Sequence, residues 1–147
     1  MPGYGVPDTN EGALPWGWAE ERLERCRNFF IATTRPSGRP HAMPVWGVWT
    51  DGLFVFSTAI TSVKSENLKE NAAVAITVEV GIDALVLEGE AFLAQLDQVP
   101  GFTDNYKKKY DYTIDEGPVW AVRLKKAFGF IGDDSFPQTA TRWSWEL

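Results

Sequence analysis

The segment from Gly38 to Asn71 constrains the fold more than any other part of the chain, because it joins two extended runs through a tight-turn signal. The first run, Pro40 to Trp49, is rich in valine and tryptophan, and the second, Leu53 to Ser57, is apolar and aromatic. Thr50-Asp51-Gly52 lies between them and contains Asp-Gly, the strongest short signal for a β-hairpin. The segment therefore predicts two paired antiparallel strands. A sheet that includes them is expected to form the centre of the fold.

The rest of the chain alternates short strands with helices. Further strands are expected at Phe29 to Thr34, Ala72 to Val80, Ala84 to Gln95 and Val119 to Ile131. Helices are expected at Trp16 to Asn28, Ser62 to Glu70 and Asp97 to Tyr110. Short connections favour antiparallel pairing of these six strands. We therefore predict a mainly β fold of the α+β kind, a small antiparallel barrel with peripheral helices.

The length of 147 residues is that of one ordinary domain. Residues 1–15 are rich in Gly and Pro and are expected to form an extended N-terminal arm, and residues 16–147 form the domain. No stretch is apolar for long enough to span a bilayer, and the N-terminus lacks the order of a signal peptide. The single cysteine, Cys26, cannot form an internal disulfide. A cytoplasmic protein is expected.

Charge and residue counts exclude several kinds of site. The net charge of −6 argues against nucleic-acid binding, which needs a basic face. One histidine and one cysteine rule out the usual zinc sites, so no metal is expected. His41 remains a candidate acid or base, and the alternative is that it is structural or lines a ligand. An anionic ligand would need a local basic patch.

One such patch is predicted where the second strand of the hairpin leads into a helix. Ser57 and Thr58 end the strand, Ser62 is a good N-cap, and Lys64 and Asn67 follow on the helix. A helix N-terminus offers unpaired N–H groups and a positive dipole end, and serine and threonine hydroxyls donate to phosphate oxygens. The pattern therefore indicates an anion site, and the alternative is an ordinary capped helix with a solvated lysine.

Five motifs in order give the chain a resemblance to a known superfamily. They are GRPHAMPVWGVW, LFVFSTAITSVKSENLKEN, AVAITVE, LVLEGEA and TATRW. This set resembles the flavin- and deazaflavin-binding split-barrel superfamily, which includes pyridoxamine 5′-phosphate oxidase and actinobacterial coenzyme F-420-dependent reductases. The resemblance covers most of the chain after Phe29 and implies a six-stranded antiparallel split β-barrel with peripheral helices.

The resemblance also implies a homodimer with two cofactor sites at its interface, and it assigns residues to each part of the site. The strand Met43, Pro44, Val45 and Trp46 would pass along the tricyclic ring, and Ser57 and Thr58 would contact the ring or the ribityl chain. Ser62, Lys64 and Asn67 would hold the phosphate. Arg142 and Trp143 in the tail would close the site of their own or the partner subunit.

Two departures from the family pattern bear on the cofactor. Val63 stands where pyridoxamine 5′-phosphate oxidases usually carry arginine, and their C-terminal pattern is not evident, so vitamin B6 oxidation is not expected. Ser62 stands where users of coenzyme F-420 often carry a second basic residue. The candidates to supply the missing charge are the side chains of Arg35, Arg39 and Lys69. The choice between FMN and coenzyme F-420 stays open.

The resemblance therefore implies an FMN- or coenzyme F-420-dependent oxidoreductase that transfers a hydride between its cofactor and a small organic acceptor. The acceptor is not identified by the sequence. One alternative is a non-enzymatic carrier of flavin or another planar ligand on the same fold, since folds host many functions. A second alternative is a structural domain with no small-molecule site.

Overall fold

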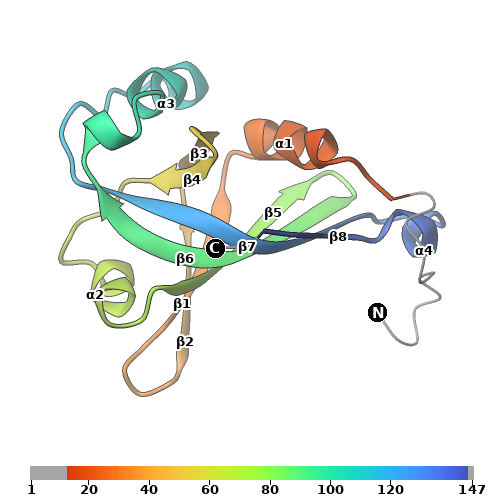
Figure 1. Ribbon diagram of the computed structural model, residues 1–147, viewed down its shortest axis with the longest axis horizontal. Helices are drawn as coiled ribbons and strands as arrows, with labels where there is room; N and C mark the ends of the chain where they lie inside the picture. Colours follow the sequence, from red (N-terminus) through yellow and green to blue (C-terminus); the bar gives the residue numbers. More distant parts are fainter. Residues whose placement is uncertain (1–12, 146–147) are drawn as a thin grey trace.

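One curled antiparallel sheet organises residues 13–145, which the computed structural model describes (Figure 1). Its eight strands are β1 (Phe29–Thr34), β2 (Pro40–Val45), β3 (Gly47–Thr50), β4 (Leu53–Phe56), β5 (Ala73–Val80), β6 (Asp83–Ala94), β7 (Val119–Ile131) and β8 (Thr141–Ser144). The strand order is β2-β1-β5-β6-β7-β4-β3, and β8 pairs with β7. The helices are α1 (Trp16–Arg25), α2 (Val63–Glu70), α3 (Phe102–Tyr110), α4 (Phe136–Thr139) and the 3₁₀ turn η1 (Leu96–Gln98). The predicted split barrel with peripheral helices is confirmed.

The strand count differs from the six predicted because one predicted strand is divided and the tail adds another. Val45 of β2 pairs with Phe29 of β1, whereas Gly47 of β3 pairs with Phe56 of β4. The chain therefore passes from one end of the strand order to the other within a single residue, Trp46. The prediction of a single strand from Pro40 to Trp49 is therefore wrong. The sheet curls, so that the chain turns at Trp46 and leaves one edge of the sheet for the other.

The predicted helix Asp97 to Tyr110 is also divided, into η1 and α3. Val99 has φ −133° and ψ 65°, which is outside the helical region. It precedes Pro100, and the proline ring disfavours helical dihedrals in the residue before it. Similarly, α1 ends at Arg25, three residues before the predicted end at Asn28, because Cys26 is extended. Of the predicted N-terminal arm, residues 1–12 lie outside the described residues.

The core has two parts, one on each side of β3 and β4. The larger part fills the concave face of the sheet beneath α1, and its largest buried side chains include Leu23, Phe29, Phe54 and Phe56. The smaller part lies between α3 and the other face of β3, β4 and β7, and includes Phe102. Burial of each such side chain contributes about 1.5–3 kcal/mol to folding. Leu68 of α2 also belongs to the larger part, so the core joins α2 to the sheet.

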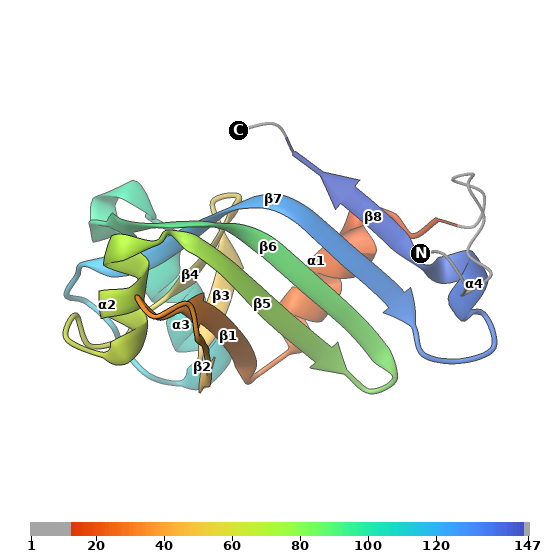
Figure 2. The same ribbon diagram turned by 90° about the horizontal axis from the view of Figure 1, so that it is seen from below.

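Helix α2 connects β4 to β5 at one end of the sheet, and β8 lies at the other end in both views (Figures 1 and 2). The hairpin of β1 and β2 extends beside α2. None of the helices in residues 13–145 has the length and apolar character that crossing a membrane requires.

Candidate functional site

The N-terminus of α2 is built by a chain of hydroxyl groups. Ser62 is the N-cap, and its Oγ accepts a hydrogen bond from the Ser65 amide at 3.2 Å. The Thr58 hydroxyl donates to the same oxygen at 3.4 Å. The amides of Val63 and Lys64 precede the first hydrogen bond of the helix ladder, which closes on Glu66. The predicted cap is therefore confirmed, and the helix presents N–H donors at its first turn.

Two buried polar side chains fix α2 to the sheet. The Ser65 hydroxyl donates to the Ala59 carbonyl at 2.8 Å and accepts from the Trp120 indole N–H at 2.9 Å. The Asn67 side-chain amide donates to Thr33 Oγ1 at 3.0 Å, and both residues are 3 % exposed. Asn67 thus faces β1, and its contact with a phosphate stays a prediction. Thr33 was not predicted to matter, because a threonine near the end of a strand gives no local signal.

His41 lies on β2 directly opposite Thr33 of β1, so both side chains point to the face on which α2 packs. His41 is half-buried, and its Nδ1 is buried without a hydrogen-bond partner in the described part of the chain. Burial, followed by the charges of Arg35 and Lys64, lowers the pKa of His41 from 6.5. The imidazole is therefore neutral at pH 7 and lies within a cationic field.

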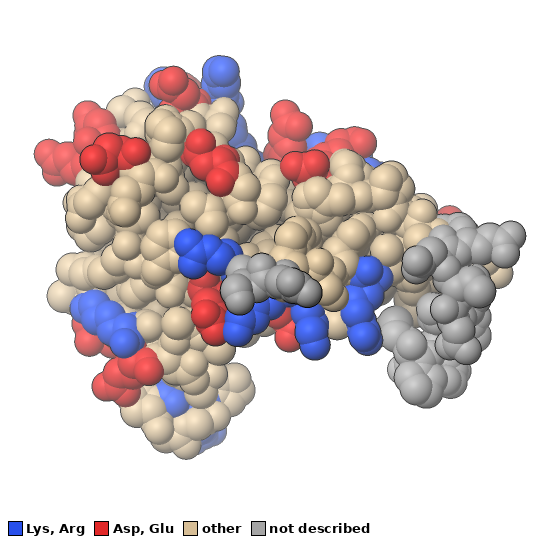
Figure 3. Space-filling view, viewed as in Figure 1, with Lys and Arg blue, Asp and Glu red and all other residues tan. Residues whose placement is uncertain are grey.

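The basic residues around α2 differ in how they are engaged. Lys69 Nζ pairs with Glu66 at 2.8 Å and donates to the Ile60 carbonyl, so its charge is already compensated. Lys64 forms no ion pair within residues 13–145. In Figure 3 the tip of the β1–β2 hairpin, at the bottom of the view, shows blue side chains, whereas red ones are frequent over α1 and α3 at the top. Of the residues predicted to supply missing charge, Arg35 is the one whose charge acts on this site through His41.

Apolar side chains flank this cationic end of α2. Ile60 and Val63 are 40 % and 45 % exposed, and Met43, two residues along β2 from His41 and on the same face, is 43 % exposed. Exposed large apolar groups beside a few polar donors are typical of a ligand site or a subunit contact. Exposed apolar side chains and polar donors therefore occur together at this end of α2.

The other residues predicted to lie along the ring are divided among different environments. Val45 is part of the core, and Pro44 pairs with Phe30 on the outer face of the sheet. The Trp46 ring stacks on Tyr110 with centroids 4.6 Å apart and planes 5° apart, and its N–H donates to Asn28. Trp46 is therefore fixed at the barrel corner, on the side toward α3. Ser57 is half-buried and directly follows β4, which ends at Phe56, one residue before the predicted end of the strand.

The tail residues lie far from α2 within one chain. Arg142 and Trp143 belong to β8, at the opposite end of the sheet from α2 (Figures 1 and 2). The Arg142 guanidinium lies over the Phe128 ring at 5.2 Å. The Trp143 ring packs edge-on against Trp16, with centroids 5.3 Å apart. These two residues reach an α2 site only if a second chain brings them there.

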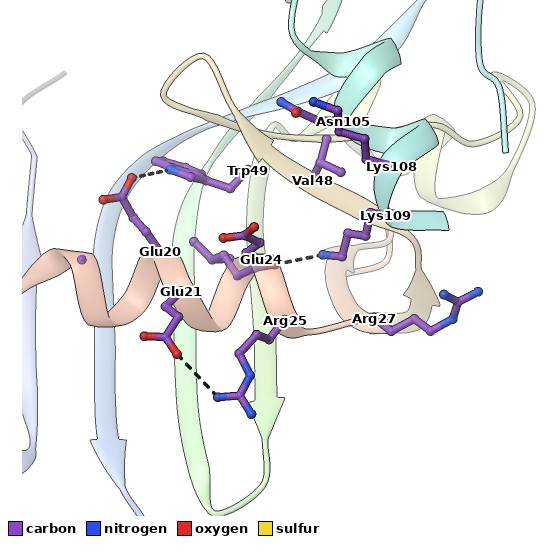
Figure 4. Close-up of a pocket in the computed structure, with 12 residues that line it drawn as sticks. Glu20, Glu21, Glu24, Arg25, Arg27, Val48, Trp49, Asn105, Lys108 and Lys109 are labelled. Atoms are coloured by element: carbon purple, nitrogen blue, oxygen red, sulfur yellow. Dashed lines mark hydrogen bonds and ion pairs between the residues drawn. The ribbon is translucent and has the colours of Figure 1, made fainter. Parts of the chain in front are cut away.

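A groove of about 830 Å³ in the described part of the chain lies at a different place, between α1, β3 and α3 (Figure 4). Glu20 and Glu24 line one wall, and Lys108 and Lys109 line the other. Lys109 Nζ donates to the Leu23 carbonyl at 2.9 Å. Burial lowers the pKa of Lys109 to about 8. The groove includes none of the residues predicted to bind a cofactor. Its Lys109 joins α3 to α1 through the hydrogen bond to Leu23.

The described residues hold no cluster of three or more histidine, cysteine or carboxylate side chains placed to bind a metal ion. The donors brought together at α2 are instead hydroxyls, backbone amides and a lysine, which suit an anion.

Comparisons with known proteins agree with the fold. The family model described as pyridoxamine 5′-phosphate oxidase matches residues 18–127. An F420 reductase structure is 25 % identical, with a TM-score of 0.60, and the match covers 74 % of this chain and 94 % of that one. A heme binding protein from Mycobacterium smegmatis is 18 % identical, with a TM-score of 0.67, over 86 % of this chain and 57 % of that one.

A conserved hypothetical protein from Mycobacterium tuberculosis is 19 % identical, with a TM-score of 0.67, over 81 % of this chain and 86 % of that one. The search of curated proteins gave no match. The two mycobacterial structures show the fold alone, whereas the family model covers about three quarters of the sequence. The chain therefore belongs to the pyridoxamine 5′-phosphate oxidase family, whose split-barrel fold it has.

Proposed function

We propose that this protein binds FMN or coenzyme F-420 at the N-terminus of α2 and transfers a hydride between that cofactor and a small organic acceptor. The observation that carries the proposal is Lys64 at the first turn of α2, which has no ion pair in the described part of the chain and whose charge contributes to lowering the pKa of His41. In a chain of net charge −6, such a group of positive charge is a local exception. A phosphate group is the ligand that it suits best.

The donors of this site match a phosphate by their chemistry. Ser62, the first-turn amides and Lys64 would hold the phosphate oxygens, and Ser57 and Thr58 would contact the adjoining chain or the ring. Met43, Pro44, Val45 and Trp46 form the strand proposed to follow the ring, where exposed Met43 offers an apolar surface. Asn67 supports the site from behind by holding α2 on β1.

The cofactor, when bound, supplies the hydride chemistry, and the protein supplies position and electrostatics. No protein nucleophile is required for such a reaction. The proton for the acceptor would come from solvent, because the lowered pKa of His41 leaves its imidazole neutral at pH 7. The similarity to an F420 reductase supports the deazaflavin, whereas Ser62, in the place of a second basic residue, weighs against binding of the polyanionic tail of coenzyme F-420.

We further propose that the active form is a homodimer. Phe30 is 53 % exposed on the outer face of β1, next to Pro44 on β2 and to the cross-strand pair Ala32 and Ala42. An exposed apolar patch of this kind is typical of a protein interface. The site is also incomplete in one chain, because β8 with Arg142 and Trp143 lies at the far end of the sheet.

The proposal is tested by titrating the purified protein with FMN and with coenzyme F-420 and by recording the absorbance spectrum of the bound cofactor. The variant Lys64→Ala should weaken binding by about 1–3 kcal/mol, or roughly five- to 150-fold, as expected for a charge-assisted hydrogen bond. Lys69→Ala is the matched control, since Lys69 lies on the same helix and is already paired with Glu66. Equal affinities of the wild type and Lys64→Ala would refute the assignment.

Turnover separates an enzyme from a carrier on the same fold. The reduced, loaded protein should pass its hydride to at least one member of a panel of quinones, tetrapyrroles and unsaturated ketones. A protein that binds the cofactor tightly and reduces none of them would support the alternative of a flavin carrier.

A further inference from the structure

The groove between α1, β3 and α3 has carboxylates on one wall and ammonium groups on the other (Figure 4). Glu20 and Glu24 are four positions apart in α1, so they lie on the same face of the helix. Lys108 and Lys109 line the facing wall from α3. The volume of about 830 Å³ is typical of small-molecule sites in proteins. The groove is therefore large enough to hold a ligand with two charged ends.

Several charged side chains of the lining already have partners within the described chain. Arg25 pairs with Glu21 at 3.6 Å. The Arg27 guanidinium lies over the Trp46 ring, 4.8 Å from its centroid. Lys109 Nζ donates to two backbone carbonyl groups, at 2.9 and 3.3 Å. These groups stabilise the fold, and they leave little capacity for a ligand.

One charge on each wall is left without such a partner. Glu24 and Lys108 are both exposed, and neither forms an ion pair within residues 13–145. They also do not pair with each other across the groove. Glu20 and Glu24 bring two like charges to one face of α1, where charges four positions apart repel. A cation between the two carboxylates and an anion at Lys108 would therefore both be favourable.

The groove is apolar between its charged walls. It is lined there by β3, which packs against both α1 and α3. Val48 is 3 % exposed, and Trp49 is half-buried. The Trp49 indole N–H donates to Glu20 Oε2 at 3.0 Å, so it holds that carboxylate beside the indole ring. An aromatic ring next to a carboxylate suits an ammonium group, because both attract a cation.

We propose that this groove is a binding site for a small zwitterion, an amino carboxylate whose two charged groups are separated by a short apolar chain. Its ammonium group lies between Glu20 and Glu24, beside the indole ring. Its carboxylate group lies at Lys108, and its apolar chain follows Val48 and Trp49. A ligand of this kind pairs the unused charges of both walls and adds no net charge, whereas a ligand with a single charge pairs those of one wall only.

The inference goes beyond the proposed function and does not depend on it, because the groove includes none of the residues predicted to bind a cofactor. The probe is 6-aminohexanoate, titrated by calorimetry into the full chain without added FMN or coenzyme F-420. Low ionic strength is used, since salt screens exposed charges. Hexanoate and hexylamine, which carry one of the two charges each, are the matched controls. We expect 6-aminohexanoate to bind about tenfold or more tightly than either control.

NMR and paired variants locate the binding. The indole N–H signal of Trp49 should shift in step with the calorimetric saturation. Glu24→Gln and Lys108→Met should each weaken the binding of 6-aminohexanoate about fivefold or more. Glu21→Gln and Lys107→Met are the controls, because each of these side chains is already held in an ion pair on its own helix. All four side chains are exposed, so the variants are expected to fold.

Three results would overturn the inference. The first is an absence of saturable binding of 6-aminohexanoate at millimolar concentration, and the second is an equal affinity for hexanoate or hexylamine. The third is an equal loss of affinity in Glu24→Gln and Glu21→Gln. Unchanged binding of 6-aminohexanoate by Lys64→Ala would support the groove as a separate site, whatever the cofactor titrations show.

Discussion

Asn67 offers a sharp test of how the site is built, because the structure gives it an anchoring role and family resemblance gives it a ligand role. Its side-chain amide donates to Thr33 Oγ1 at 3.0 Å, and both residues are 3 % exposed. We expect Asn67→Ala to destabilise the protein rather than to weaken cofactor binding. Lys64→Ala should have the opposite pattern.

The magnitude follows from the burial of both partners. A net hydrogen bond contributes about 0.5–1.5 kcal/mol, and a buried acceptor left without a donor costs about 1–3 kcal/mol. Asn67→Ala removes the donor and leaves Thr33 Oγ1 buried, so the unfolding free energy should fall by about 2–3 kcal/mol. Thr33→Val removes the other partner, and the double variant should lose at least about 1 kcal/mol less than the sum of the two single losses.

The assay is urea unfolding at one fixed protein concentration, combined with FMN titration under conditions where each variant is folded. FMN affinity of Asn67→Ala should stay within about threefold of the wild type, a difference below about 0.7 kcal/mol. An Asn67→Ala protein as stable as the wild type, with FMN affinity reduced tenfold or more, would refute the anchoring role and restore Asn67 as a phosphate ligand.

Two further predictions concern stability away from α2. Burial lowers the pKa of Lys109 from 10.5 to about 8, so between these values the unfolded chain binds more protons than the folded one. The unfolding free energy of the wild type should therefore rise from pH 8 to pH 10 relative to Lys109→Met, and a constant difference across urea unfolding at pH 7.5, 8.5 and 9.5 would contradict this. At the β-bulge after Glu88, a Cβ on Gly89 would press on the Arg123 carbonyl oxygen, so Gly89→Ala should cost about 1–3 kcal/mol. Gly17→Ala in α1, where a Cβ meets no atom within 4 Å, should be neutral or stabilising by up to about 1 kcal/mol, and equal melting temperatures of the two variants would show that the bulge tolerates a side chain.

The sequence predicted those parts of the fold that depend on local pattern. β1 and β7 occupy the predicted ranges, and α2 begins at the predicted N-cap, because alternation and capping are properties of a few neighbouring residues. The corner at Trp46 could not be predicted in this way. It arises because β2 pairs with β1 and β3 pairs with β4, which are contacts between distant segments. The pairing of β8 with β7 is a contact of the same kind.

The candidate site shows the same division between local and distant information. Ser62 and Lys64 were predicted from one helix N-terminus, and the structure confirms the cap. The neighbourhood of His41 and Lys64 was not predicted from their spacing, because it depends on how α2 packs against the β1–β2 hairpin. The burial of Asn67 likewise depends on Thr33, thirty-four positions away. The family resemblance indicated which residues form the site. The packing of α2 on the sheet determines what each of these residues contacts.

The net negative charge of the chain does not conflict with an anion site, because charge acts locally in a protein. At physiological ionic strength the field of an exposed charge is screened over about 8 Å. The acidic side chains over α1 and α3 lie at the top of Figure 3, whereas the β1–β2 hairpin lies at the bottom. Arg35 and Lys64, from two elements that meet only in the fold, are the charges that, after burial, lower the pKa of His41. The acidic side chains over α1 and α3 would repel anions from that part of the surface, and so they would favour binding on other faces, the α2 site among them.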